Sequence, residues 1–368
     1  MINLERYEEI KENTVTGRYV TLAMLGAFLD KTTSKFTVET IGVSVLKKEI
    51  LGITLGHGPV KILMWSQMHG NESTTTKAIL DLINFLGENS EAAESILGAC
   101  TIKIIPVLNP DGAMAYTRVN ANGIDLNRDA QNLSQPESVL LSTVYDNFGP
   151  DYCFNLHDQR TIFNVGNSPN PATVSFLAPT HDEERSISAN RGKSMKLIVA
   201  MEQELQKVVP GQIGRFDDAF NANCVGDSFQ MKGTPTVLFE AGHTYGDYQR
   251  EKTRKYIFYA LVVALREISN DQVEKYDRDA YFSIPENNKL FLDIIIDNVV
   301  GLNKKYGGKD SAGILYKEVL EGSQINFEPH IEKLGDLKGY FGHKTYNCLD
   351  KRDLDQLIND KPLYNLLV

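Results

Sequence analysis

The chain has 368 residues, of which 42% are hydrophobic and 23% are charged, which is an ordinary balance for a globular protein of one large domain or two. Its 48 acidic residues outnumber the 38 basic ones, and the net charge of -10 argues against a nucleic-acid partner, which needs clustered lysine and arginine. No run of 18 apolar residues predicts a transmembrane helix, so we expect no membrane partner.

The beginning of the chain, MINLERYEEIKENT, is too polar for a signal peptide. The four cysteines contain no C-x-x-C pair and are expected to be buried free thiols; they are Cys100, Cys153, Cys224 and Cys348. Free thiols suit a reducing compartment, so the sequence as it stands predicts a cytoplasmic protein.

Strand-like and helix-like segments alternate from about residue 50 to residue 268. Apolar segments bounded by glycine or polar residues predict strands at 50–56, 60–67, 101–109, 151–157 and 234–242. Helical spacing of apolar residues predicts helices at 73–86, where Ser73 is available as a cap, and around 183–208 and 249–267. Nearly continuous apolar strands separated by helices predict an α/β fold, with a mixed, mostly parallel sheet flanked by helices on both faces.

The pattern changes from about residue 277, where the segments become shorter. Residues 312–335, AGILYKEVLEGSQINFEPHIEKLG, resemble a hairpin with EGSQ at its turn. We therefore expect a large domain over residues 1–276 and a small β-rich C-terminal domain over residues 277–368, for which the sequence indicates no role.

Polar side chains follow several of the predicted strands, at the edge where open α/β sheets bind ligands. His69 and Glu72 follow one strand, while His157 and Glu240 end two others. An imidazole and a carboxylate at this spacing can hold one metal ion, and a third protein ligand with water would complete an open, catalytic zinc site. The alternative is a hydrogen-bonded histidine at a strand end and a solvated glutamate in the first turn of a helix.

The segment VLNPDGAMAYTRVNANGIDLNRDAQ, residues 107–131, is rich in turn residues and carries two arginines. A guanidinium group is well shaped for a carboxylate, and a second one could face an oxyanion. Arg118 and Arg128 are therefore candidate substrate contacts, with a solvated surface position as the alternative for each.

Six motifs occur in an order that resembles the zinc metallocarboxypeptidase family. They are MHGNE, NPDG, a lone arginine, GIDLNR, a histidine in FNLHD and a glutamate in TVLFEAGH. Each motif is short, but six in the right order are specific. The likeness covers roughly residues 40 to 265 and leaves the C-terminal hundred residues unexplained.

The resemblance implies a role for each matching residue. His69, Glu72 and His157 would hold one zinc ion, with Asp125 accepting a hydrogen bond from His69. Arg118 would stabilise the oxyanion, Glu240 would be the general base, and Asn127 and Arg128 would bind the terminal carboxylate of the substrate.

The sequence also departs from the family pattern. Members usually carry a mobile tyrosine some twenty residues before the general base, but residues 214–229 contain Phe216 and Phe220 and no tyrosine. Asp158 and Arg160 follow the third expected ligand and form either a structural ion pair or a substrate contact. The loop between Arg118 and Asn127 is short, as in bacterial members that act on peptidoglycan-type peptides.

The resemblance therefore predicts a zinc-dependent hydrolase that removes a C-terminal residue from a peptide, with cell-wall peptides as one substrate class. The alternative is a zinc amidohydrolase or deacylase acting on a small N-acyl amino acid, whose relatives lack the carboxylate clamp in a DLNR block. A third hypothesis is a non-catalytic binding protein on the same fold. The presence of Arg118 and Glu240 argues against it.

Overall fold

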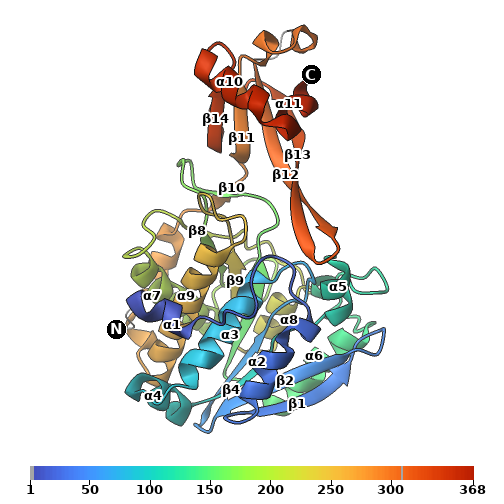
Figure 1. The fold of residues 1–368 in the computed structure, drawn as a ribbon. Coiled ribbons are helices and arrows are strands. Elements are labelled where there is room, and N and C mark those ends of the chain that lie inside the picture. The colour runs from blue at the N-terminus through green and yellow to red at the C-terminus, as the bar shows by residue number, and fades with distance from the viewer. Residues whose placement is uncertain (1–3, 308–309) are drawn as a thin grey trace.

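The structure is a computed structural model that describes residues 4–307 and 310–368. Figure 1 shows a large α/β part and a smaller part, coloured orange to red, that is built on a separate sheet. No helix in the described residues is long and apolar enough to cross a membrane.

The large part is built around an eight-stranded sheet with the order β1-β2-β4-β3-β5-β9-β7-β8. Its strands are β1 (Thr37–Val43), β2 (Glu49–Gly56), β3 (Val60–Trp65), β4 (Cys100–Ile105), β5 (Tyr152–Asp158), β7 (Val174–Leu177), β8 (Ile213–Arg215) and β9 (Thr236–Ala241). The four central strands β4, β3, β5 and β9 run parallel, while β1, β2 and the β7–β9 pair introduce antiparallel neighbours. The predicted mixed sheet is confirmed.

Helices cover both faces of this sheet. The α-helices of the large part are α1 (Tyr7–Ile10), α2 (Gly26–Thr32), α3 (Thr74–Leu86), α4 (Glu91–Ala99), α5 (Pro110–Ala115), α6 (Pro136–Phe148), α7 (Ala189–Leu205), α8 (Val225–Met231) and α9 (Glu251–Ser269). The short 3₁₀ helices of the chain are η1 (Leu4–Arg6), η2 (Leu22–Leu25), η3 (Leu126–Arg128), η4 (Val273–Lys275), η5 (Arg278–Ser283), η6 (Val299–Gly301) and η7 (Lys304–Tyr306).

The side chains of β3 point alternately to the two faces of the sheet, which shows why helices must cover both faces. Ile62 and Met64 enter a cluster packed by α3, α7 and α9, whereas Leu63 and Trp65 enter a second cluster packed by α6 and α8. Successive side chains of a strand point to opposite faces, so a strand that is apolar at every position must be buried on both sides.

The N-terminus of α3 is capped differently from the expectation. Ser73 occupies the N-cap position, but its hydroxyl donates to the backbone oxygen of Arg18, at 2.6 Å, and makes no cap hydrogen bond. The carboxylate of Asp158 accepts from the backbone N–H groups of Thr74 and Thr75 instead, at 2.8 and 3.2 Å. A carboxylate is favoured there because the first N–H groups of a helix lack partners within the helix.

The smaller part contains a four-stranded sheet with the order β13-β12-β11-β14. Its elements are β11 (Phe291–Asp297), β12 (Ser311–Glu321), β13 (Gln324–Gly335), β14 (Phe341–Asn347), α10 (Lys351–Asn359) and α11 (Lys361–Leu367). The predicted hairpin is present, with its turn between Glu321 and Gln324. Helices α10 and α11, which the sequence reading did not anticipate, cover one face of the sheet with Leu357, Leu363 and Leu367.

The segment before β11 packs against the large part. The backbone N–H of Ala178 donates to the hydroxyl of Tyr281, in η5, at 3.1 Å, and Tyr281 is fully buried. The short strand β10 (Asn287–Asn288) pairs with β6 (Asn164–Val165). The division into domains at residues 276 and 277 stays a prediction.

Candidate active site

The candidate site lies at one edge of the large sheet. Strands β3, β5 and β9 are parallel neighbours, so the segments that follow their carboxyl ends meet at the same edge. His69 and Glu72 lie in the loop between β3 and α3, while His157 is on β5. Glu240 is the partner of His157 in the β5–β9 register, which places the two side chains on the same face of the sheet.

Three of the predicted residues bring possible metal ligands together. One ligand atom each from His69, Glu72 and His157 lies within 4.8 Å of the other two, and all three side chains are buried. Glu72 Oε1 lies 2.9 Å from His69 Nδ1, and Glu72 Oε2 lies 2.9 Å from His157 Nδ1. Among the described residues, this is the one group of histidine, cysteine, aspartate and glutamate side chains that could hold a metal ion.

The donor atoms of this group fit a zinc ion. The two Nδ1 atoms of His69 and His157 face each other at 3.1 Å. Nε2 of His69 is 3.0 Å from Asp125 Oδ1, and a proton held in that contact leaves Nδ1 of a neutral ring as an electron-pair donor. Two imidazole nitrogens and one carboxylate form the protein ligand set of an open zinc site.

Asp125 also joins the predicted oxyanion residue to the ligands. Arg118 Nε donates to Asp125 Oδ2 at 3.0 Å, and Arg118 Nη1 lies 3.4 Å from Glu72 Oε1. Although burial raises the pKa of Asp125, its contacts with His69 and Arg118 outweigh that effect and hold the pKa below its ordinary value. Asp125 is therefore ionised and can orient both of its neighbours.

The two glutamates of the site have opposite pKa shifts. Burial raises the pKa of Glu72, but the adjacent imidazoles of His69 and His157 outweigh it and hold the pKa well below the ordinary value. Burial raises the pKa of Glu240 well above its ordinary value, and the carboxylates of Glu72 and Asp158 add to this rise. A carboxyl group with a raised pKa is better able to hold and return a proton.

These residues line a cavity of about 570 Å³. Seven of the eight predicted site residues face it, namely His69, Glu72, Arg118, Asn127, Arg128, His157 and Glu240, while Asp125 supports them through His69 and Arg118.

The predicted carboxylate-binding pair is held beside α8. Asn127 Oδ1 accepts from the backbone N–H of Val225 at 2.9 Å, which fixes the position of η3. Arg128 is exposed, and its Nη1 contacts Cys224 Sγ at 3.1 Å. Cys224 also lines the cavity and is partly exposed, so the expectation that every cysteine is buried is wrong at this position; Cys100, Cys153 and Cys348 are buried.

Several other residues raised by the sequence make different contacts. His243, three residues after Glu240, is not among the residues that line the cavity, and its Nε2 lies 2.5 Å from Arg250 Nη2. Phe216 lines the cavity and packs edge-on against Phe163, with ring centroids 5.2 Å apart, in the region where the resemblance led us to expect a tyrosine. Arg160 forms an ion pair with Glu318 of β12 at 2.7 Å, a partner too distant in the sequence to be predicted.

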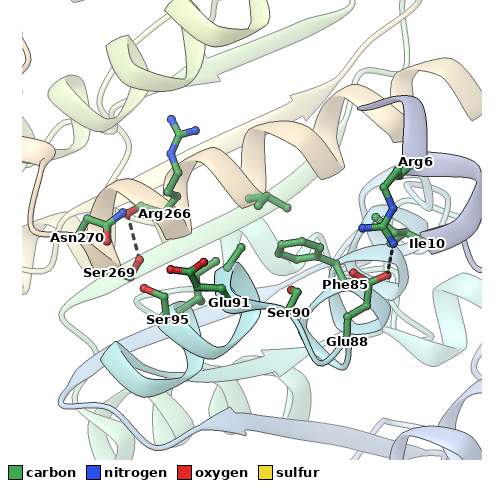
Figure 2. Close-up of a pocket in the computed structure, with 13 residues that line it drawn as sticks. Arg6, Ile10, Phe85, Glu88, Ser90, Glu91, Ser95, Arg266, Ser269 and Asn270 are labelled. Carbon is green, nitrogen blue, oxygen red and sulfur yellow. Dashed lines mark hydrogen bonds and ion pairs between the residues drawn. The ribbon is translucent and has the colours of Figure 1, made fainter. Parts of the chain in front are cut away.

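A second hollow, of about 440 Å³, lies between the first residues of the chain, α3, α4 and α9 (Figure 2). Its wall includes Phe85 and Ile10, and Arg6 and Glu88 form an ion pair at 3.7 Å across it. None of the predicted site residues lines this hollow.

Comparisons with known proteins show what parts of this chain are similar to. The sequence model of the zinc carboxypeptidase family matches residues 21–188. Carboxypeptidase 2 of Trichophyton rubrum is 29% identical over 100 residues, which are 27% of this chain and 19% of the relative. Carboxypeptidase SOL1 of Arabidopsis thaliana is 35% identical over 89 residues, which are 21% of this chain and 18% of the relative. The chain thus spans about a fifth of the length of these curated relatives.

Solved structures show the same fold at low sequence identity. The metallo-carboxypeptidase from Burkholderia cenocepacia superposes with a TM-score of 0.56 and 17% identity, over 68% of this chain and 70% of the other. Carboxypeptidase A from Helicoverpa armigera gives a TM-score of 0.55 and 15% identity, over 73% of this chain and 80% of the other.

The chain thus has the fold of the solved metallocarboxypeptidases, and it carries a His–Glu–His cluster that could hold a metal ion. Residues 21–188 match the model of the zinc carboxypeptidase family, so this part of the chain is similar to members of that family.

Proposed function

We propose that this protein is a zinc-dependent carboxypeptidase that removes the C-terminal residue of a peptide. The observation that carries the proposal is the convergence, in one cavity, of a possible metal site with a buried glutamate and two arginines. The family match supports zinc-dependent peptide hydrolysis in general terms. The resemblance implies the individual roles below, and contacts within this chain support them.

The metal site would be formed by His69, Glu72 and His157, with one zinc ion per chain. A zinc ion bound there would acidify a water molecule and polarise the peptide carbonyl. Asp125 would keep the Nε2 proton on His69 and so keep its Nδ1 free for the metal.

Glu240 would be the general base. It faces the cavity on the strand beside His157, and its raised pKa suits a group that accepts a proton from water and then passes it to the leaving amine. Arg118 would stabilise the negative charge that develops on the carbonyl oxygen, because its guanidinium lines the same cavity beside Glu72.

Asn127 and Arg128 would bind the free carboxylate of the substrate. The Arg128 side chain reaches the cavity without a carboxylate partner among the described residues, so its charge is available for a ligand. An N-acyl amino acid, the alternative substrate class, carries the same free carboxylate, so the substrate panel described below is what separates the two classes. The short loop between Arg118 and Asn127 is the feature behind cell-wall peptides as a candidate substrate class.

The proposal is tested by measuring zinc content alongside hydrolysis of a panel of peptides and N-acyl amino acids. One zinc ion per chain and release of C-terminal residues from peptides are expected. Hydrolysis of N-acyl amino acids alone would identify a deacylase, and two tightly bound ions per chain would contradict the assigned ligand set. A protein that holds zinc and hydrolyses neither class would be a binding protein on this fold.

A further inference from the structure

The C-terminal part of the chain places one acidic side chain against the large part. Glu318 lies on β12, on the hairpin that projects toward α5 (Figure 1), and its side chain is only 8% exposed. Its carboxylate pairs with Arg18 at 3.1 Å and with Arg160 at 2.7 Å, and it accepts a hydrogen bond from the hydroxyl of Tyr116. All three partners belong to the large part.

Arg160 links this carboxylate to the loop that carries two of the proposed zinc ligands. Its Nη2 pairs with Glu318, while its Nη1 donates to the backbone oxygen of Asn71 at 2.8 Å. Asn71 lies between His69 and Glu72 in the sequence. One planar guanidinium thus connects a residue of the C-terminal sheet with the backbone between the ligands.

The other two partners of Glu318 adjoin the same site. The backbone oxygen of Arg18 accepts from the hydroxyl of Ser73, the residue after Glu72, at 2.6 Å. Tyr116 precedes Arg118 by two residues, and its ring lies 5.4 Å from the guanidinium of Arg160. The three segments that meet at Glu318 are therefore segments that carry or adjoin site residues.

The charge balance makes Glu318 difficult to replace. Although burial raises its pKa, the guanidinium groups of Arg18 and Arg160 outweigh that effect and lower the pKa to about 2. Among the described residues, Arg18 has no other ion-pair partner, and its Nε and Nη1 are buried without a hydrogen bond. Without the carboxylate, two buried or partly buried cations would face each other uncompensated.

We propose that Glu318 is a positioning residue of the proposed active site. It holds Arg160, and Arg160 holds the backbone between His69 and Glu72 in the geometry that brings their ligand atoms together. The inference rests on the proposed function, because it gives the C-terminal part a role in zinc binding. Arg160 also lines the cavity, but its Nη groups already contact Glu318, Asn71 and Tyr116. These contacts fix the loop that carries His69 and Glu72.

The first test compares Glu318→Gln with Glu328→Gln. Glu328 lies on β13, opposite Lys317, so its side chain is on the other face of the hairpin from Glu318, and it is exposed. Zinc affinity, measured by competition with a chelator well below the melting temperature, should fall about tenfold or more in Glu318→Gln, as it does when residues that orient ligands are changed. Glu328→Gln should keep the wild-type affinity.

A lowered melting temperature with unchanged zinc affinity in Glu318→Gln would overturn the inference, because it would mean that the carboxylate only stabilises the fold. A wild-type protein that binds no zinc would instead contradict the proposed function itself. The two failures are therefore distinguishable.

The second test uses Arg160→Lys, in case Glu318→Gln does not fold. Lysine keeps the positive charge beside Glu318, so the charge balance of the cluster survives. Its single ammonium cannot reproduce the fork that contacts both Glu318 and the Asn71 oxygen. We expect a similar loss of zinc affinity in Arg160→Lys, and wild-type affinity in this variant would refute the role of Arg160 in holding the loop.

Discussion

Nε2 of His69 lies 3.0 Å from Oδ1 of Asp125, and this contact decides which nitrogen of the imidazole can bind a metal. The same carboxylate pairs with Arg118 at 3.0 Å through its second oxygen. One aspartate therefore orients both a proposed zinc ligand and the proposed oxyanion contact.

The change Asp125→Asn tests this arrangement. An amide can adopt an orientation that still contacts His69, but it lacks the negative charge that fixes both neighbours. We expect zinc affinity to fall by about 10- to 100-fold, measured by chelator competition. Asp217→Asn is the control, because Asp217 lines the same cavity with a side chain that is 77% exposed; equal affinities in the two variants would contradict the orienting role.

The change Glu240→Gln separates catalysis from metal binding. Glutamine has nearly the same shape but cannot accept a proton, so turnover should fall by about 10²- to 10⁴-fold. Zinc content should stay at the wild-type value, because Glu240 is not among the clustered ligands. Steady-state kinetics with parallel metal analysis measures both quantities. Near-normal turnover would show that another group acts as the base.

The proposed contact between Arg128 and the substrate carboxylate can be tested by changing the substrate, the protein or both. Amidating the C-terminus of a peptide substrate should strongly weaken catalysis by the wild-type protein, because a charge-assisted pair would be lost. In Arg128→Ala the same amidation should matter much less. The comparison forms a double-mutant cycle between protein and ligand, in which indirect structural effects partly cancel. If amidation affects both proteins equally, Arg128 does not bind the carboxylate.

Backbone packing beside the ligands leads to a prediction about Gly70. A Cβ atom at Gly70 would lie 1.9 Å from the backbone carbonyl carbon of Gly112 and 2.1 Å from the backbone nitrogen of Ala113. Gly70→Ala should therefore displace the loop, with a loss of about 1–3 kcal/mol of stability and weaker zinc binding. Gly98→Ala, in α4, is the control, because a Cβ there meets nothing within 4 Å. Chemical unfolding and chelator competition measure the two effects.

Acid stability should depend on Glu251, which is not among the residues that line the cavity. Burial raises its pKa, but Lys77 at 2.5 Å, together with Lys11 and Arg254, lowers it from 4.5 to about 2. A carboxyl group whose pKa is lower in the folded state than in the unfolded state stabilises the fold at pH values above its unfolded-state pKa. That contribution is lost as the pH falls toward its folded-state pKa. The shift corresponds to at most about 3 kcal/mol.

Urea unfolding from pH 6 to pH 2 checks this expectation. The difference in free energy of unfolding between the wild type and Glu251→Gln should shrink as pH falls from 4.5 to 2. Glu328→Gln, at an exposed position, should follow the wild type over the whole range. A constant difference between the wild type and Glu251→Gln would mean that the ionisation of Glu251 does not stabilise the fold.

Local sequence patterns predicted much of the fold for a physical reason, and the family resemblance implied the ligand set of the metal cluster. Residues 62–65 of β3 are apolar because they are buried on both faces of the sheet. His69 and Glu72 stand out because they are polar residues that directly follow this buried strand. Their convergence with His157 follows from the parallel pairing of β3 and β5, which brings two strand ends together.

Contacts between residues that are far apart in the sequence could not be predicted from local patterns. Glu318 sits in the strand segment YKEVLE, where a charged residue has the appearance of a solvent-facing position, and only the packing of β12 on the large part buries it. Helix α10 has few apolar residues, spaced along a strongly charged segment, so its composition did not indicate a packed helix. Ser73 was expected to cap α3 on local grounds, yet Asp158, from a different strand, supplies the cap.

The pair formed by Arg18 and Glu318 joins positions 300 residues apart. A contact between such distant residues forms late in folding, because a long stretch of chain must be ordered first. During synthesis the N-terminal segments emerge and begin to fold before β12 exists. The large sheet can therefore begin to assemble on the ribosome before Glu318 is available to hold Arg160. On our proposal, this separates in time the formation of the fold from the completion of the proposed metal site.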